Sequence, residues 1–237
     1  MSAIHPDLDL AGRIRPGLDI LANEIVIGLK KRTRFARNQA VYEPGLVIGQ
    51  PDRSLLDYEL SRIEACHAEL GRYTFASQDA FSDVSAVSPI IARSAPQSPV
   101  QRMASGMGER IIHFYLGWIG EACPPGDLPD TYGETVTSDV ATLLSILERV
   151  NLGKSVAEAK FVELTDAFIE SKGDREAMLA LIVRKDREAA VFDIARSLAR
   201  RYELDEALTV RVFEFMIATT IDIEVDYLRK RIANARA

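Results

Sequence analysis

The segment Val140–Phe161, VATLLSILERVNLGKSVAEAKF, decides the fold class of this chain. Apolar residues recur in it every three or four positions, which predicts one long amphipathic helix. Two cations, Arg149 and Lys160, stand eleven positions apart in it. Eleven helical steps make about three full turns, so both side chains are expected on one face, about 16 Å apart along the axis. Cations on an otherwise apolar, inward-facing stripe are costly unless an anion lies beside them.

Helical spacing extends outward from this segment in both directions. Further helices are predicted at 18–34, 55–70, 111–119, 177–183, 189–198 and 208–232. Alternating segments typical of strands are nearly absent, so the prediction is an all-α, two-lobed helical bundle with long helices. Breaks rich in Ser, Pro and Gly occur at 82–99 and 123–129. We expect a single domain over residues 1–237, with lobes of about 1–130 and 131–237, the second carrying most of the active site.

Composition limits the classes of function. The 237 residues are 47% hydrophobic and 27% charged, with a net charge of −6, as in an ordinary globular protein. The acidic balance does not favour nucleic-acid binding, and the basic run 30–37 is predicted to be a solvated helix end. The mostly apolar stretch 111–120 is too short to span a bilayer, so no membrane association is expected. The first residues lack the pattern of a secretory signal, and the two cysteines have no CxxC spacing, so we expect a cytoplasmic protein.

Common catalytic motifs are missing from the sequence. There is no GxGxxG, GxxxxGK[ST], HExxH or GxSxG, and the three histidines are widely spaced. We therefore expect no metal and no cofactor, and a site built from Arg, Lys and carboxylates. Thr220 and Glu224 lie one helical turn apart, and Asp186-Arg187-Glu188 opens a further predicted helix. From spacing alone, a structural interpretation is the more common one: Arg149 and Lys160 would be surface charges, Glu188 a favourable first-turn acid, and Thr220 and Glu224 part of a solvated face.

Four stretches of the sequence favour a functional role for these charged residues. They are 15–42, 56–67, 148–161 (ERVNLGKSVAEAKF) and 220–228 (TIDIEVDYL). In these stretches the chain resembles chorismate mutase of the larger, all-helical eukaryotic type. The resemblance covers 13–83 and 133–232 and is weak over 84–130.

The resemblance implies an isomerase that converts chorismate to prephenate in phenylalanine and tyrosine biosynthesis, by conformer binding and electrostatic stabilisation. It implies that Arg15 and Arg149 bind the two substrate carboxylates. Lys160 then contacts the ether oxygen and a carboxylate, and a protonated Glu224 donates to the same ether oxygen. Burial among carboxylates would raise the pKa of Glu224.

The resemblance also assigns substrate-binding residues. Glu188 would accept the ring hydroxyl with Arg187 orienting it, and Thr220 would lie near a carboxylate. Arg184 stands where the family has a short Asp or Asn, so it points outward, pairs with Glu188 or binds a carboxylate. Pro16 follows Arg15 directly and is predicted to open the helix at its first position.

A regulatory site and a homodimer are further implications. In the resembling enzymes, aromatic amino acids bind at a dimer interface, and Arg72, Gly133 and Thr137 match that effector-site pattern. Gly71 and Glu134 replace an arginine and a serine of the pattern, which removes a cation and adds an anion. We therefore predict weak or absent control by tyrosine and tryptophan.

Two other functions stay open. One is a pyruvate lyase acting on isochorismate in the same kind of cationic pocket. The other is a noncatalytic helical regulatory module derived from such an enzyme.

Overall fold

The computed structural model describes residues 5–92, 94 and 97–236, and all regular structure in these ranges is helical. The longer helices are α1 Arg15–Arg32, α2 Leu55–Glu69, α3 Gly108–Ala122, α4 Tyr132–Glu163, α5 Thr165–Glu170, α6 Arg175–Ile182, α7 Lys185–Arg201 and α8 Glu206–Arg236. A π-helix at Leu10–Ile14 precedes α1, and short 3₁₀ helices lie at Pro6–Leu8, Gln39–Tyr42, Arg72–Thr74 and Pro129–Thr131. The predicted all-α class is confirmed.

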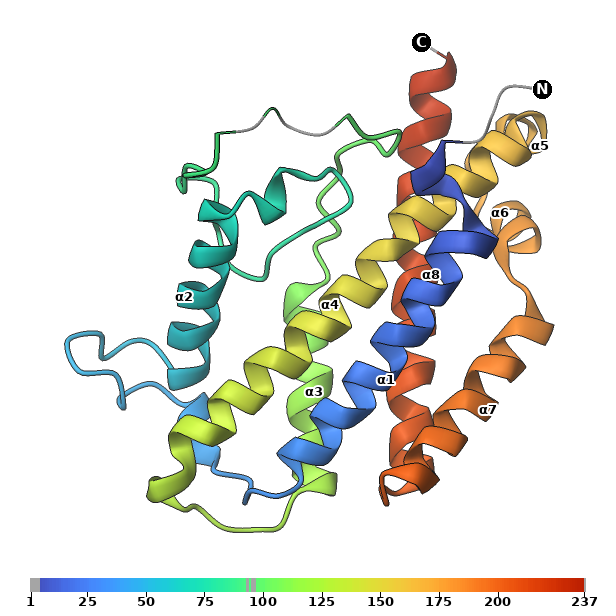
Figure 1. Ribbon diagram of the computed structural model, residues 1–237. Coiled ribbons are helices and arrows are strands. Elements are labelled where there is room, and N and C mark those ends of the chain that lie inside the picture. Colours follow the sequence, from blue (N-terminus) through green and yellow to red (C-terminus); the bar gives the residue numbers. More distant parts are fainter. Residues whose placement is uncertain (1–4, 93, 95–96, 237) are drawn as a thin grey trace.

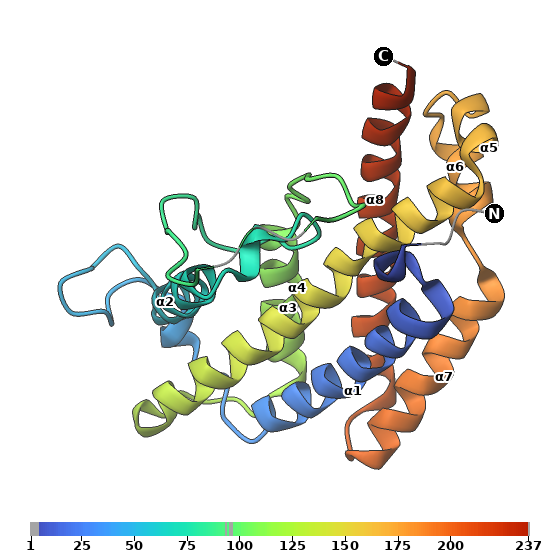
Figure 2. The same ribbon diagram turned by 45° about the horizontal axis from the view of Figure 1, so that its top comes forward.

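The long helix α4 crosses the whole molecule and organises the bundle (Figure 1). It packs most extensively against α8 and α1, and α7 packs against α8 (Figure 2). The helix α2 lies on the other side of α4, away from α7. Helices α1, α7 and α8 therefore come together on the side of α4 opposite α2.

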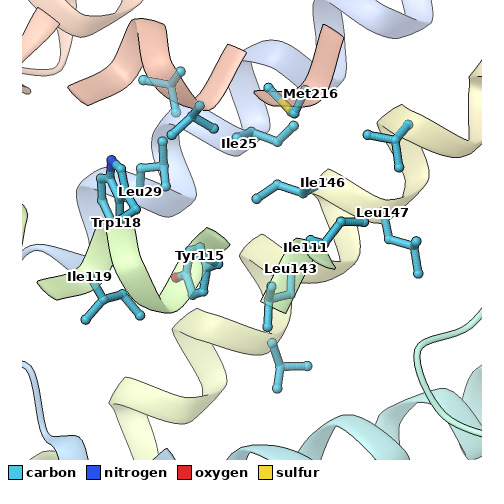
Figure 3. Close-up of a cluster of buried hydrophobic side chains, with 14 of the residues drawn as sticks. Ile25, Leu29, Ile111, Tyr115, Trp118, Ile119, Leu143, Ile146, Leu147 and Met216 are labelled. Carbon is cyan, nitrogen blue, oxygen red and sulfur yellow. The ribbon is translucent and has the colours of Figure 1, made fainter. Parts of the chain in front are cut away.

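One hydrophobic cluster joins the two expected lobes. Figure 3 shows part of this cluster, to which α1, α3, α4 and α8 contribute Ile25, Leu29, Ile111, Tyr115, Trp118, Leu143, Ile146 and Met216. Each fully buried large apolar side chain contributes about 1.5–3 kcal/mol to stability. The cluster fixes α4 relative to α1 and α8, which carry the side chains described below.

The basic run 30–37 corrects one expectation. Lys31 and Arg34 are exposed as predicted, but Arg32 is fully buried. Its Nε forms an ion pair of 2.8 Å with the buried Asp139. Its guanidinium also donates to the Ala36 carbonyl at 2.9 Å and to other oxygens of the same turn. A solvated position is wrong for Arg32 because α4 supplies it with a buried counterion.

The segment 82–99 contains no helix among its described residues, in agreement with the predicted break. Arg93, Ala95 and Pro96 lie outside the described residues. The buried carboxylate of Glu64 accepts hydrogen bonds from the backbone N–H groups of Phe81 and Ser82, both at 2.7 Å. These bonds anchor the start of the break to α2.

The start of α1 differs slightly from the prediction. Asp9 accepts hydrogen bonds from Ala11 N at 3.1 Å and Gly12 N at 2.8 Å, which caps the π-helix. α1 begins at Arg15, so Pro16 is its second residue rather than its first. The missing N–H of Pro16 therefore coincides with the change from π-helix to α-helix.

Among the residues that the structure describes, no helix combines the length and apolar composition needed to cross a membrane.

Candidate active site

A cavity of about 780 Å³ opens between α1, the second half of α4, the start of α7 and the middle of α8. The structure brings together in its lining all the catalytic and substrate-binding candidates named from the sequence. These are Arg15, Arg149, Lys160, Arg184, Arg187, Glu188, Thr220 and Glu224. Residues more than 200 positions apart in the chain thus meet at one site because α1 and α8 pack against the same helix.

One face of α4 forms a wall of the cavity. Arg149, Gly153, Val156 and Lys160 follow one another at helical spacing, and all four line the cavity. Arg149 and Lys160 therefore share a face, as the spacing predicts. The wall carries a cation at each end and small or apolar groups between them.

Arg149 is a buried cation for which the described part of the chain provides no counterion at contact distance. Only 5% of the residue is exposed, and its guanidinium lies 5.6 Å from the ring centroid of Phe213. Its Nε has no hydrogen-bond partner among the described residues. Burial lowers the pKa of Arg149 to about 10, and the Asp19 carboxylate acts in the opposite direction. An anion in the cavity would supply the missing partner.

Lys160 and Glu224 form a largely buried pair at the other end of the wall. Lys160 Nζ donates to Glu224 Oε2 at 2.8 Å and to the Ile182 carbonyl at 3.0 Å. An ammonium has three N–H groups, so one remains for a ligand. Burial raises the pKa of Glu224, while the nearby Lys160 charge acts to lower it. The direction of this shift is the one expected from the sequence.

Thr220 contributes a methyl group and a hydroxyl whose proton is already used in a hydrogen bond within α8. Its Oγ1 donates to the Met216 carbonyl at 2.7 Å, one turn earlier in α8. In this rotamer the hydroxyl proton is used within the helix, so the oxygen can accept but not donate to a ligand. The Thr220 methyl carbon faces Gly153 of α4.

The start of α7 places charged groups at the mouth of the cavity. Arg184 is the N-cap residue of α7 and is exposed, as is Arg187, while Glu188 is half-buried. Among the described residues, no ion pair joins Arg184 to Glu188. Of the three possibilities for Arg184, pairing with Glu188 is therefore not adopted.

Three further cavity residues were missed by the sequence reasoning. Asp19, Gly153 and Glu163 line the cavity together with the expected groups. Asp19 lies one helical turn after Arg15, so the i, i+4 spacing on α1 could have found it. No comparable local signal marks Gly153, because its importance depends on the approach of α8.

The effector-pattern residues lie apart within one chain. Arg72 forms an ion pair with Glu148 of α4. Gly133 and Thr137 are exposed in the first turns of α4. Thr137 precedes Glu148 by eleven residues, which corresponds to about 16 Å along the helix axis. A site that uses all three effector-pattern residues would therefore need a second chain.

No cluster of three or more His, Cys, Asp or Glu residues suited to a metal ion occurs within the described ranges. The cations that line the cavity are Arg15, Arg149, Lys160, Arg184 and Arg187.

The chain is similar to known proteins over nearly its whole length. Residues 132–225, which include most of the cavity wall and Glu224, match the family model of chorismate mutase type II. A chorismate mutase of Pichia angusta is 28% identical over 247 residues, covering 95% of this chain and 88% of that protein. A chorismate mutase of Schizosaccharomyces pombe is 27% identical over 252 residues, covering 98% and 100%.

Solved structures share the whole fold. The crystal structure of a Candida albicans chorismate mutase in complex with L-Trp has a TM-score of 0.84 and 25% identity, covering 96% of this chain and 93% of that one. The chloroplast chorismate mutase of Zea mays has a TM-score of 0.82 and 22% identity, covering 93% and 94%. Over nearly its whole length the chain is therefore similar to fungal and plant proteins named chorismate mutase, which are isomerases, and it shares their all-helical fold.

Proposed function

We propose that this protein converts chorismate to prephenate by a Claisen rearrangement, a step of phenylalanine and tyrosine biosynthesis. One observation carries the proposal: a buried, unpaired Arg149 shares a cavity with the Lys160–Glu224 pair. The names of the relatives supply the substrate.

The reaction suits a site without a nucleophile. An ether C–O bond breaks while a C–C bond forms within one molecule, and no atom or electron is lost. The enzyme must hold a dicarboxylate in a compact conformer and stabilise the negative charge that grows on the ether oxygen. Fixed cations and hydrogen-bond donors are sufficient for both tasks.

Arg149 and Arg15 bind the two carboxylates in this proposal. A planar guanidinium can bind a carboxylate through two parallel hydrogen bonds, which fixes direction as well as position. Arg149 is largely buried in the free protein and lies against Phe213. Its charge therefore needs little reorganisation when the substrate enters.

Lys160 and Glu224 act on the ether oxygen. The free N–H of the Lys160 ammonium donates to that oxygen. The positive charge of the ammonium also attracts the neighbouring substrate carboxylate. Glu224 must be protonated to donate a hydrogen bond there. Burial already raises its pKa, and the two substrate carboxylates would raise it further because like charges disfavour ionisation.

The residues at the mouth orient the ring. Glu188 accepts the ring hydroxyl, and Arg187 beside it holds the carboxylate in place. Arg184 lines the same cavity, which supports its role as an additional carboxylate contact. Thr220 lies near a substrate carboxylate. It does not donate a hydrogen bond to that carboxylate, because its hydroxyl proton is used in the bond to the Met216 carbonyl.

We also propose a homodimer located in the cytoplasm. Apolar side chains are exposed in the loop before α2, on α2 and directly after it, including Ile48, Ile63 and Leu70. A second copy would cover such a surface and could bring Gly133 and Thr137 to a partner residue. The cytoplasmic location agrees with two unpaired cysteines and with a maize relative named cytosolic.

Product identification tests the function. Purified protein is incubated with chorismate and, separately, with isochorismate, and the products are separated by liquid chromatography and weighed by mass spectrometry. Prephenate from chorismate is expected. Pyruvate and salicylate from isochorismate would favour the lyase instead, and no consumption of either substrate would favour the noncatalytic module.

A further inference from the structure

Helix α8 packs directly against α4 at Gly153, which lines the cavity. A Cβ atom built on this glycine would lie 3.0 Å from Thr220 Cγ2 and 3.3 Å from the Thr220 carbonyl oxygen. It would also lie 3.6 Å from Ile223 Cγ2. The first two separations are shorter than ordinary van der Waals contact. Any side chain at position 153 would therefore push against the backbone of α8 as well as against a methyl group.

The same helix pair carries the Lys160–Glu224 bond. Lys160 lies two helical turns after Gly153 on α4, and Glu224 lies one turn after Thr220 on α8. The two helices run in the same general direction and cross along this line (Figure 1). Because packed helices move as rigid elements, their separation at Gly153 also sets the separation of Lys160 and Glu224.

We propose that Gly153 is a positioning residue: by admitting α8 to backbone contact at Thr220, it sets Glu224 at hydrogen-bonding distance from Lys160 and gives the cavity its width. This inference rests on the proposed function, since it concerns the same cavity. Gly153 acts through Thr220 and Glu224 and has no reactive group of its own.

The expected effect of a methyl group can be separated from helix stability. A glycine inside a helix is unfavourable relative to alanine, so Gly153→Ala alone would favour the helical state of α4. The methyl group would nevertheless displace α8 by a few tenths of an ångström, because the Thr220 carbonyl cannot rotate away. We therefore expect turnover to fall while the protein stays folded.

The chain offers a matched control and a second-site rescue. Gly117 lies on α3, and a Cβ built there would have no atom within 4 Å, so Gly117→Ala adds the same methyl in open space. Thr220→Ser removes the Cγ2 atom nearest to the added methyl and keeps the hydroxyl that donates to Met216. In the double variant G153A/T220S, α8 can return toward α4.

The experiment compares kcat and KM for chorismate in the wild type, G117A, G153A, T220S and G153A/T220S, with thermal unfolding of each. We expect G117A to match the wild type. We expect kcat of G153A to fall about tenfold or more, with a smaller change in KM, and the double variant to recover most of the kcat of T220S. Wild-type kcat in G153A, or a double variant no more active than G153A, would overturn the proposal.

Crystal structures of the wild type, G153A and the double variant give a readout that needs no turnover. The proposal predicts that G153A moves α8 away at Thr220 and lengthens the Lys160–Glu224 bond beyond 2.8 Å, and that T220S reverses both changes. An unmoved α8 would overturn it. A wild type inactive on chorismate would instead refute the proposed function, and the crystal structures would still decide the role of Gly153.

Discussion

The ammonium of Lys160 lies 2.8 Å from a carboxylate oxygen of Glu224, although the two side chains are only 17% and 7% exposed. A buried pair of this kind is costly to desolvate and is weak support for stability by itself. Its position at one end of a cavity whose other end holds the unpaired Arg149 gives it a chemical use. In the proposed reaction, the remaining N–H of Lys160 and a protonated Glu224 both donate to the ether oxygen.

Replacing Glu224 tests its protonation. The protonated form is the active one in this account, and burial raises the pKa of Glu224 above the ordinary glutamate value. Wild-type kcat/KM should therefore fall as the pH rises through that raised pKa. An amide donates a hydrogen bond at any pH, so Glu224→Gln should keep its activity at higher pH. The check is the pH profile of kcat/KM for both proteins, and an unchanged profile would reject the donor role.

Truncating Arg149 tests the buried anion anchor. Arg149→Ala should cost about 3 kcal/mol or more of transition-state stabilisation, or about a hundredfold in kcat/KM. Arg149→Lys keeps the charge but not the planar fork, so it should recover only part of the loss. Steady-state kinetics measure both variants. If Arg149→Ala turned over chorismate at close to the wild-type rate, the site assignment would be wrong.

Removing the counterion of Arg32 tests the buried network at the far end of α1. Asp139→Asn leaves a buried guanidinium without its ion pair, which should lower the free energy of unfolding by about 3–5 kcal/mol. Asp193→Asn breaks an exposed ion pair with Arg196, and this should change the free energy of unfolding by less than about 1 kcal/mol. Urea unfolding followed by circular dichroism measures both. Equal effects of the two substitutions would contradict the structural role given to Asp139.

Aromatic amino acids should have little effect on activity. Arg72 is already paired with Glu148, and the exposed Glu134 puts a negative charge where the effector-site pattern has a serine. The measurement is the initial rate on chorismate with and without added tyrosine or tryptophan, together with calorimetric titration of each. Tight binding that changes the rate would overturn this prediction.

The sequence was most informative where the information is local. The eleven-residue spacing of Arg149 and Lys160 predicts a shared face, and the i, i+4 spacing of Thr220 and Glu224 predicts another, since helix geometry is nearly constant. Both faces do line one cavity. That their residues bind and transform chorismate remains a proposal.

Non-local features could not be predicted in this way. The basic run gives no sign that Arg32 is buried, because its counterion Asp139 comes from a helix more than 100 residues later. The periodic segment from residue 140 also misses the first two turns of α4, which begins at Tyr132. Gly153 looks like a weak point in a helix until the Thr220 carbonyl is found against it. Each of these features depends on which helices pack together.

The formation of prephenate by the wild type and by Lys160→Ala, measured side by side as initial rates, tests the central claim most directly. The account predicts that the wild type forms prephenate. It predicts that the variant forms prephenate at a rate reduced about a hundredfold or more, because one preorganised donor to the ether oxygen is lost. Equal rates in the two proteins would contradict it.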